Sequence, residues 1–213
     1  MIVVTVLGGS ISLFPRGSIA SVEEQRARLP PPTDCPDKVE GTWAALYFAT
    51  NQQWLEYTAV IRRTTPVADG NAAGPLTVDM TAHLWDGPKN DPKTPACTPG
   101  QREVTVTMPG TGNVDAGTSL TFRATTYTVA KVHCGNDTRY YPDNFKGTLE
   151  PARQEFQALN NDGNTAVNEP VVFRRVRCTS TAVPPPSSGP NRAGTAAKPP
   201  SFEPPKRLFS CGR

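Results

Sequence analysis

Residues 76–85, Leu-Thr-Val-Asp-Met-Thr-Ala-His-Leu-Trp, alternate apolar and polar side chains without a break. This period of two is typical of a β-strand with one buried face, because successive side chains of a strand point to opposite sides. The alternation recurs in residues 55–61, 104–108 and 120–124. Turn-forming sequences that contain Asp-Gly and Pro-Gly separate the runs. The pattern predicts seven to nine antiparallel strands, joined mostly by short hairpins.

Strands that each carry one apolar face must bury those faces against one another. Closure of the meander into a small barrel buries them and removes free strand edges, whereas a β-sandwich is the alternative. We therefore expect an all-β fold. One short helical segment is predicted in Pro151–Leu159, because a proline opens it and Phe156 and Leu159 lie three residues apart.

Composition divides the chain into four parts. The chain has 213 residues with 23 Pro, and its 19% of charged residues is below the usual share, which disfavours long helices. Residues 1–20 resemble a signal segment, although a buried first strand is the alternative. A Pro-rich leader (residues 21–38), a β-barrel domain (residues 39–180) and a disordered, Pro-rich basic tail (residues 181–213) follow.

The charge balance limits the partners. The chain carries 22 Lys and Arg against 19 Asp and Glu, and the excess positive charge lies in the tail. We expect no nucleic-acid partner, because the domain itself is close to neutral. The tail could contact an anionic surface such as that of a membrane, although a solubilising spacer is the plainer interpretation.

The five cysteines are Cys35, Cys97, Cys134, Cys178 and Cys211. Four of them fall in or beside the domain, and in an exported chain they predict two disulfides with three pairings open. Cys35 with Cys178 is favoured because the two flank the first and last strands, and Cys97 with Cys134 because both accompany long insertions. The wide spacing and the two histidines predict no metal site, and we expect no cofactor. An extracytoplasmic location follows from the signal segment and the disulfides.

The sequence contains few candidates for chemistry. It has no motif of a serine hydrolase, zinc protease or nucleotide-binding enzyme, so we do not expect an enzyme. A hydrolase with paired carboxylates is a remote alternative, with Glu150, Glu155 and Glu169 as candidates. Aromatic side chains are the better candidates for ligand binding, although packing beneath a loop is the alternative for the tryptophans; these residues are Trp54, Tyr57, Trp85 and Tyr127.

Two short motifs resemble those of lipocalin-like and avidin-like barrels. They are Gly41-Thr42-Trp43 in the first strand and Phe173-Arg174-Arg175 in the last strand. In that pattern a Gly-x-Trp packs against an arginine and closes the floor of the barrel. The resemblance implies that Trp43 is a structural plug with Arg174 or Arg175 across its indole. Arg174 is favoured if Phe173 points into the core and the stacking occurs outside the floor.

A second resemblance covers most of the domain. Residues 23–37, Gly41-Thr42-Trp43 and residues 145–178 look like the corresponding stretches of uncharacterised exported proteins of myxobacteria. This resemblance implies an extracytoplasmic protein and supplies no catalytic residue.

The sequence thus favours an exported, non-enzymatic barrel that binds a small apolar ligand or an envelope component. A structural or protein-interaction module with a filled barrel is the alternative. A cavity of about 300 Å³ or more would favour the ligand binder.

Overall fold

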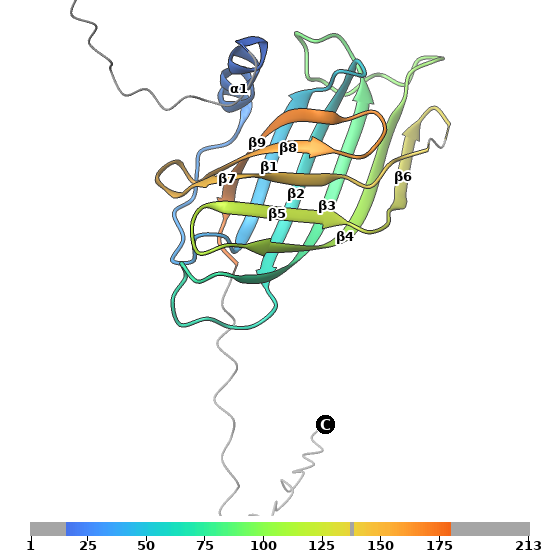
Figure 1. The fold of residues 1–213 in the computed structure, drawn as a ribbon. Helices are drawn as coiled ribbons and strands as arrows, with labels where there is room; N and C mark the ends of the chain where they lie inside the picture. Colours follow the sequence, from blue (N-terminus) through green and yellow to red (C-terminus); the bar gives the residue numbers. More distant parts are fainter. Residues whose placement is uncertain (1–15, 137–138, 180–213) are drawn as a thin grey trace, which may run out of the picture. The chain divides into compact units, whose positions relative to one another are not determined.

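The strands form one antiparallel sheet that closes on itself (Figure 1). A computed structural model describes residues 16–136 and 139–179, with side chains from residue 22 onward. In this part of the chain the strands are β1 (Gly41–Phe48), β2 (Gln53–Arg63), β3 (Gly74–Asp86), β4 (Glu103–Val114), β5 (Ser119–Ala124), β6 (Thr128–Cys134), β7 (Asn144–Glu150), β8 (Glu155–Asn161) and β9 (Val167–Arg177). No helix among these described residues is long and apolar enough to cross a membrane.

Eight of the nine strands make a closed barrel, which confirms the predicted fold class. Their order is β3-β2-β1-β9-β8-β7-β5-β4, and β4 pairs with β3 to close the circle. The first half of β4 has a second neighbour, because Glu103–Thr107 pair with β6 while Gly110–Val114 pair with β5. β6 is therefore an extra strand laid against the barrel wall.

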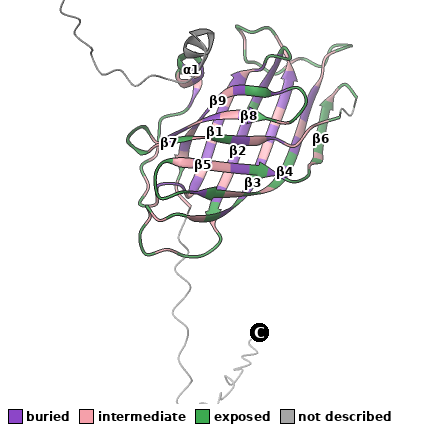
Figure 2. Ribbon diagram, viewed as in Figure 1, coloured by how far each residue is buried: buried purple, intermediate pink, exposed green. Residues whose placement is uncertain are grey.

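The barrel interior is packed with apolar side chains, as the period of two predicts. In β3 the inward residues Leu76, Val78, Met80, Ala82 and Leu84 are all buried. Figure 2 shows the same alternation of buried and more exposed positions along the other strands. Five aromatic rings fill the middle of the barrel, and each lies within 6 Å of another; they are Tyr57, Phe122, Phe145, Phe156 and Phe173.

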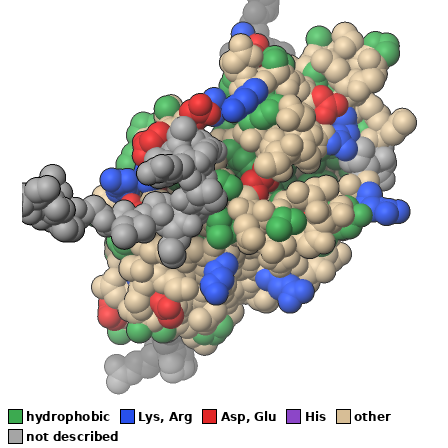
Figure 3. Space-filling view, turned by 45° about the horizontal axis from the view of Figure 1, so that its top comes forward, with side chains coloured by type: hydrophobic (Ala, Val, Ile, Leu, Met, Phe, Trp, Pro, Cys, Tyr) green, Lys and Arg blue, Asp and Glu red, His purple; other side chains and the backbone are tan. Residues whose placement is uncertain are grey.

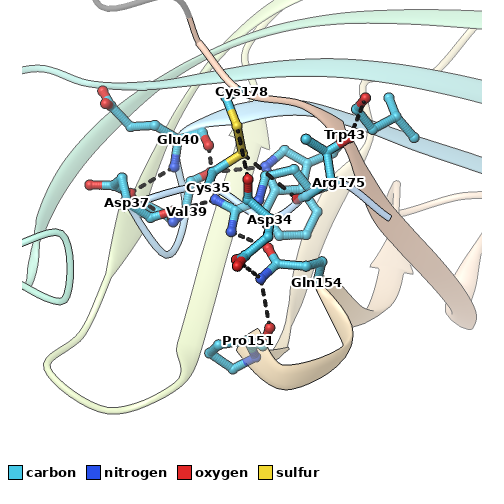
Figure 4. Close-up of a disulfide and its surroundings, with 12 residues drawn as sticks. Asp34, Cys35, Asp37, Val39, Glu40, Trp43, Pro151, Gln154, Arg175 and Cys178 are labelled. Atoms are coloured by element: carbon cyan, nitrogen blue, oxygen red, sulfur yellow. Dashed lines mark hydrogen bonds between the residues drawn. A yellow bond between two sulfur atoms is a disulfide. The ribbon is translucent and has the colours of Figure 1, made fainter. Parts of the chain in front are cut away.

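The end of the barrel where β1 begins is plugged by Trp43 (Figure 4). Trp43 is 1% exposed, and its indole Nε1 donates a hydrogen bond to the carbonyl of Val39 at 2.9 Å. The guanidinium of Arg175 lies 5.2 Å from the centre of the ring. Its Nε donates to Gln154 at 2.8 Å and its Nη1 to the carbonyl of Glu40 at 3.0 Å.

The preference for Arg174 as the stacking partner was wrong. Trp43 points into the barrel, so its partner must share the inward phase of Phe173, and that residue is Arg175. Arg174 lies on the outer face, where it forms an ion pair with Glu155 at 2.7 Å.

Gly41 allows the first strand to enter beside this plug. It has a φ of +145°, and a Cβ there would lie 2.6 Å from the carbonyl oxygen of Arg177. Only glycine accepts both the backbone conformation and the contact.

The segment expected to be a polar leader begins as a helix that packs on the barrel. Helix α1 (Arg16–Arg28) spans the junction between the predicted signal segment and leader, and it ends two residues before Pro30. Val22 and Leu29 pack on Val172 of β9. The Gln25 side chain donates to the carbonyl of Pro170 at 2.9 Å and accepts from the amide of Val172 at 2.8 Å. The leader is thus part of the folded unit.

The helical segment expected in Pro151–Leu159 is a single 3₁₀ turn, η1 (Pro151–Arg153), followed at once by β8. Strand pairing overrides the local helical signal, since Phe156 and Ala158 alternate inward opposite Phe173 and Val171. The predicted tail, the first 15 residues and Cys211 lie outside the described residues.

Cys35 and Cys178 form a disulfide, with Cα atoms 5.6 Å apart. It joins the segment that precedes β1 to the residue that follows β9 (Figure 4). Cys97 and Cys134 are also neighbours, since both sulfurs lie within 4.8 Å of each other, but they are not bonded in this structure. The second disulfide stays a prediction.

Candidate functional site

The barrel end opposite Trp43 opens into a pocket of about 520 Å³. We call it the mouth pocket. Its walls come from the β1–β2 turn, the end of β3, the residue before β4, the segment before β7 and the β8–β9 turn. Figure 3 shows a hollow at this end, with an acidic side chain inside it. The apolar side chains that fill the barrel interior therefore do not extend to this end.

A buried carboxylate network forms one wall of the mouth pocket. Asp143, which is 3% exposed, accepts hydrogen bonds from Tyr57 at 3.0 Å, from Asn160 at 2.7 Å and from Tyr140. Three donors thus fix this side chain. Burial raises the pKa of Asp143 to about 6, although the three hydrogen bonds oppose the shift. At neutral pH the group is therefore an anion, held in place inside the barrel mouth.

Glu169 supplies a second carboxylate to the same pocket. Its side chain accepts from the amide of Thr50 at 2.5 Å and from the Tyr47 hydroxyl at 3.3 Å. Burial raises the pKa of Glu169, and hydrogen bonds from Thr50 and Tyr47 oppose that shift. Burial and the nearby carboxylates also raise the pKa values of Tyr47, Tyr57 and Tyr140 well above 10, so all three hydroxyls keep their protons.

The lining as a whole is acidic and aromatic. Four carboxylates line the mouth pocket against two guanidinium groups; they are Asp86, Asp143, Asp162 and Glu169, with Arg102 and Arg139. Four tyrosines share the lining: Tyr47, Tyr57, Tyr140 and Tyr141. The pocket is thus suited to a group that donates hydrogen bonds or carries positive charge.

The candidate ligand-binding residues from the sequence do not form one site. Tyr57 lines the mouth pocket, and Tyr127 contacts Tyr140 with ring centres 5.7 Å apart. Trp54 and Trp85 stack on each other on the outer face, 6.4 Å apart, and both are buried.

Trp54 lies beneath a loop, which is the packing alternative considered for it. Its Nε1 donates to the carbonyl of Pro88 at 3.0 Å, and the Arg28 guanidinium lies 5.1 Å above its ring. Trp85 has an indole Nε1 without a partner among residues 22–136 and 139–179. Neither tryptophan lines the mouth pocket.

Of the three candidate acids from the sequence, only Glu169 lies in the mouth pocket. Glu155 is on the outer face with Arg26 and Arg174, and Glu150 bonds to Gln157. Sequence patterns did not indicate Asp143 and Asn160, which lie 17 residues apart. The signal that could have found Asp143 is the pair of tyrosines at 140 and 141, which one proline separates from it in the long insertion.

The two histidines and two of the cysteines meet on the outer wall, away from the mouth pocket lining. A hydrogen bond with Cys97, burial and nearby carboxylates raise the pKa of Cys134 to about 11. The thiol therefore holds its proton and is a poor nucleophile.

A larger hollow of about 1200 Å³ runs along the outer faces of β4, β5, β7 and β8. Threonine, asparagine and glycine dominate its lining, with the basic side chains of Arg123 and Lys146. It holds no buried charged group, so we favour the mouth pocket as the functional site.

Comparisons with known protein families, with curated proteins and with solved structures return no match for this chain. The chemistry of the mouth pocket therefore has to be argued from its own geometry.

Proposed function

We propose that this protein is an exported, non-enzymatic β-barrel that binds a small molecule in the mouth pocket. The observation that carries the proposal is a pocket of about 520 Å³ that the buried carboxylates Asp143 and Glu169 line. Pockets of roughly 300–1000 Å³ suit small ligands. A barrel filled only by its own side chains would need neither the space nor the buried carboxylates at its mouth. The Cys35–Cys178 disulfide supports an extracytoplasmic location.

The lining suggests an amphipathic ligand rather than a wholly apolar one. Asp143 and Glu169 provide negative charge at partly desolvated positions, where attraction to a cation is stronger than in water. The rings of Tyr47, Tyr57 and Tyr140 offer apolar surface and cation–π contacts beside these carboxylates. We expect a ligand with an ammonium or hydroxyl-bearing head that enters the pocket and an apolar body that contacts the tyrosines.

A secreted hydrolase is the second candidate, because two carboxyl groups with raised pKa values line one pocket. With a pKa of about 6, Asp143 could donate a proton near neutral pH while a second carboxylate acts as base or nucleophile. Binding is favoured over hydrolysis, since the three donors Tyr57, Tyr140 and Asn160 occupy the Asp143 carboxylate and favour its ionised form.

Native mass spectrometry of the full chain purified from its own host tests the binding function. We expect a retained small molecule, and in ligand-free protein we expect saturable calorimetric binding of butylammonium as a cationic probe. Glu169→Gln keeps the shape of the side chain and removes its charge, so it should weaken probe binding at least about tenfold. Arg62→Gln, in an exposed ion pair on the outer face, is the matched control and should bind as the wild type does.

The outcomes separate the candidates. Absence of both a retained molecule and probe binding would contradict ligand binding in the mouth pocket. If glycoside or ester probes are turned over instead, and Asp143→Asn abolishes the turnover while the fold is kept, the hydrolase is correct.

A further inference from the structure

Five side chains with metal-ligating atoms meet on the outer wall of the barrel. We call them the Cys–His cluster: His83 of β3, Cys97 of the loop between β3 and β4, Glu103 of β4, and His133 and Cys134 of β6. They fall into two groups of three whose ligating atoms all lie within 4.8 Å of one another, and Glu103 belongs to both. The wide spacing of these residues in the sequence hides this convergence.

The separations suit one tetrahedral ion. The carboxylate of Glu103 lies 2.9 Å from His83 Nε2 and 3.6 Å from His133 Nδ1, and its other oxygen lies 4.0 Å from Cys134 Sγ. Ligand atoms at about 2.0–2.3 Å from a tetrahedral zinc ion lie about 3.3–3.8 Å from each other. Movements of the ligating atoms by a few tenths of an ångström to about one ångström would therefore bring them to bonding positions.

Two irregularities of the backbone create the cluster. The pairing of β4 with β6 shifts register between Glu103 and Val104, so Cys134 faces Glu103, Val132 faces Val104, and His133 is the extra residue between them. Such a bulge changes the direction of side chains and allows neighbours to serve one site. Cys97 has a φ of +58°, a conformation uncommon for a residue other than glycine.

The outer nitrogen of each imidazole has its own partner. His133 Nε2 lies 3.0 Å from the Thr105 hydroxyl, and His83 Nδ1 lies 3.6 Å from the Glu56 carboxylate. Each ring thus directs its other nitrogen toward Glu103. Metal-binding histidines have this arrangement, in which an outer partner fixes the tautomer and the ring orientation.

Glu103 has no Lys or Arg partner among the described residues. It is 7% exposed, and within the described ranges only the two histidines lie within ion-pair distance of it. A buried carboxylate normally has a positive partner or a metal ion. A cation bound in the Cys–His cluster would supply that charge.

We propose that the Cys–His cluster binds one Zn²⁺ ion through four ligands, namely the thiolates of Cys97 and Cys134, the carboxylate of Glu103 and the imidazole of His83, with His133 beside Glu103. Sulfur and imidazole ligands in a tetrahedral arrangement favour zinc over calcium or magnesium. Each thiol that binds the ion releases its proton to solvent, and no oxidant or reductant takes part. The ion would fix the Gly87–Gln101 loop against β6.

The structural role proposed for the zinc ion differs from the ligand-binding role of the mouth pocket. The two sites are nevertheless connected through the loop between β3 and β4. Gly87 and Arg102 flank the ends of the same loop and both line the mouth pocket. Zinc in the cluster would therefore hold one wall of the pocket in place.

The predicted Cys97–Cys134 disulfide is the competing fate of the same sulfurs, so the test controls the redox state. Full-length protein is treated with a phosphine reductant, freed of metal by a chelator and titrated with Zn²⁺ and, separately, with Co²⁺. We expect one ion per chain with a dissociation constant below micromolar. The Co²⁺ form should show thiolate-to-cobalt charge-transfer absorption and the visible bands of a tetrahedral ion.

Variants identify the ligands. Cys97→Ser should weaken zinc binding at least about tenfold and reduce the charge-transfer absorption, and His83→Gln should weaken binding while keeping that absorption. Asp79→Asn is the matched control, because Asp79 is an exposed acid on the same face of β3. Circular dichroism of each variant verifies the fold. We expect the barrel to fold without bound zinc, so the variants should keep the wild-type spectrum.

Three results would overturn the proposal. They are a reduced protein that binds no stoichiometric zinc, a Co²⁺ spectrum typical of an octahedral site without thiolate absorption, and a Cys97–Cys134 disulfide that forms in air although equimolar zinc is present.

Discussion

At the scale of single residues, Arg175 has the most demanding position in the barrel. It is 1% exposed, lies against Trp43, and donates to the carbonyls of Asp37 and Glu40 and to Gln154. Burial lowers its pKa, but not enough to remove the charge of a guanidinium. Its charge is therefore stabilised by oxygen dipoles and an aromatic face rather than by a carboxylate at ion-pair distance within the described chain.

We predict that Arg175→Met reduces the free energy of unfolding by about 2–5 kcal/mol. The change leaves two buried carbonyls and Gln154 without their donor, and it removes the cation–π contact with Trp43. Urea unfolding followed by Trp fluorescence measures the effect. Arg177→Met, at an exposed position two residues later in the same strand, is the control and should change stability by less than about 0.5 kcal/mol. Equal midpoints for both variants would show that the plug contributes nothing.

A second residue-scale prediction concerns pH and Asp143. Its pKa is about 6 in the folded protein and about 3.9 in an unfolded chain, so the folded state binds more protons between these values. The stability that protonation of Asp143 contributes is complete below about pH 4 and is lost as pH rises through 6. The difference amounts to about 3 kcal/mol. Asp143→Asn should remove this part of the pH dependence.

Unfolding free energies of the wild type and Asp143→Asn at pH 4.5 and 7.5 test this. The wild type should lose stability relative to the variant as pH rises. The difference between the two proteins isolates Asp143 from Glu169 and His83, whose pKa values are also raised. A difference that is constant with pH would mean that Asp143 has an ordinary pKa.

At the scale of elements, α1 completes a gap in the sheet. β9 pairs with β1 only through Arg174, Arg175 and Arg177, so the earlier part of β9 lacks this neighbour. The Gln25 side chain bonds there to the carbonyl of Pro170 and the amide of Val172, as a strand backbone would. Arg26 adds an ion pair with Glu155 at 2.9 Å.

We predict that Gln25→Ala destabilises the protein by about 1–3 kcal/mol, because it leaves two buried backbone groups without their bonds to this side chain. Hydrogen exchange should show faster exchange at the amide of Val172. Glu24→Ala, at the exposed neighbouring position, is the control and should leave both measurements unchanged. Unchanged exchange at Val172 in Gln25→Ala would contradict the role assigned to α1.

The elements also show what a sequence can predict and what it cannot. The alternation in residues 76–85 correctly assigns each side chain of that stretch to the inside or outside, because strand geometry alone decides this. Arg174 was chosen over Arg175 because the direction of Trp43 at the barrel floor depends on the closed fold. The sequence could not predict the mouth pocket for a similar reason. Asp143, Asn160 and Glu169 come from three segments that only barrel closure brings together. Local patterns carry no information on such contacts.

At the scale of the whole molecule, the two ends of the barrel have opposite characters. One end is sealed by Trp43, Arg175 and the disulfide, while the other contains the mouth pocket with its buried carboxylates. Polar groups without full compensation lower stability, so a protein with an open pocket needs stabilisation elsewhere. The sealed end supplies it, and the disulfide is the strongest single constraint there.

The last prediction tests that constraint. Cys35 and Cys178 are 143 residues apart, so the bond shortens the unfolded chain across the whole barrel. The double change Cys35→Ser with Cys178→Ser should lower the free energy of unfolding by up to about 5 kcal/mol and should also increase the denaturant slope, because the unfolded chain expands once the cross-link is gone. Guanidinium unfolding in the presence of a chelator measures both quantities. Arg62→Gln, in an exposed ion pair on the outer face, is the control and should change neither. A double variant with the stability of the wild type would contradict the stabilising role of this disulfide. A peptide map that joins Cys35 to Cys97 or Cys134 would contradict the pairing itself.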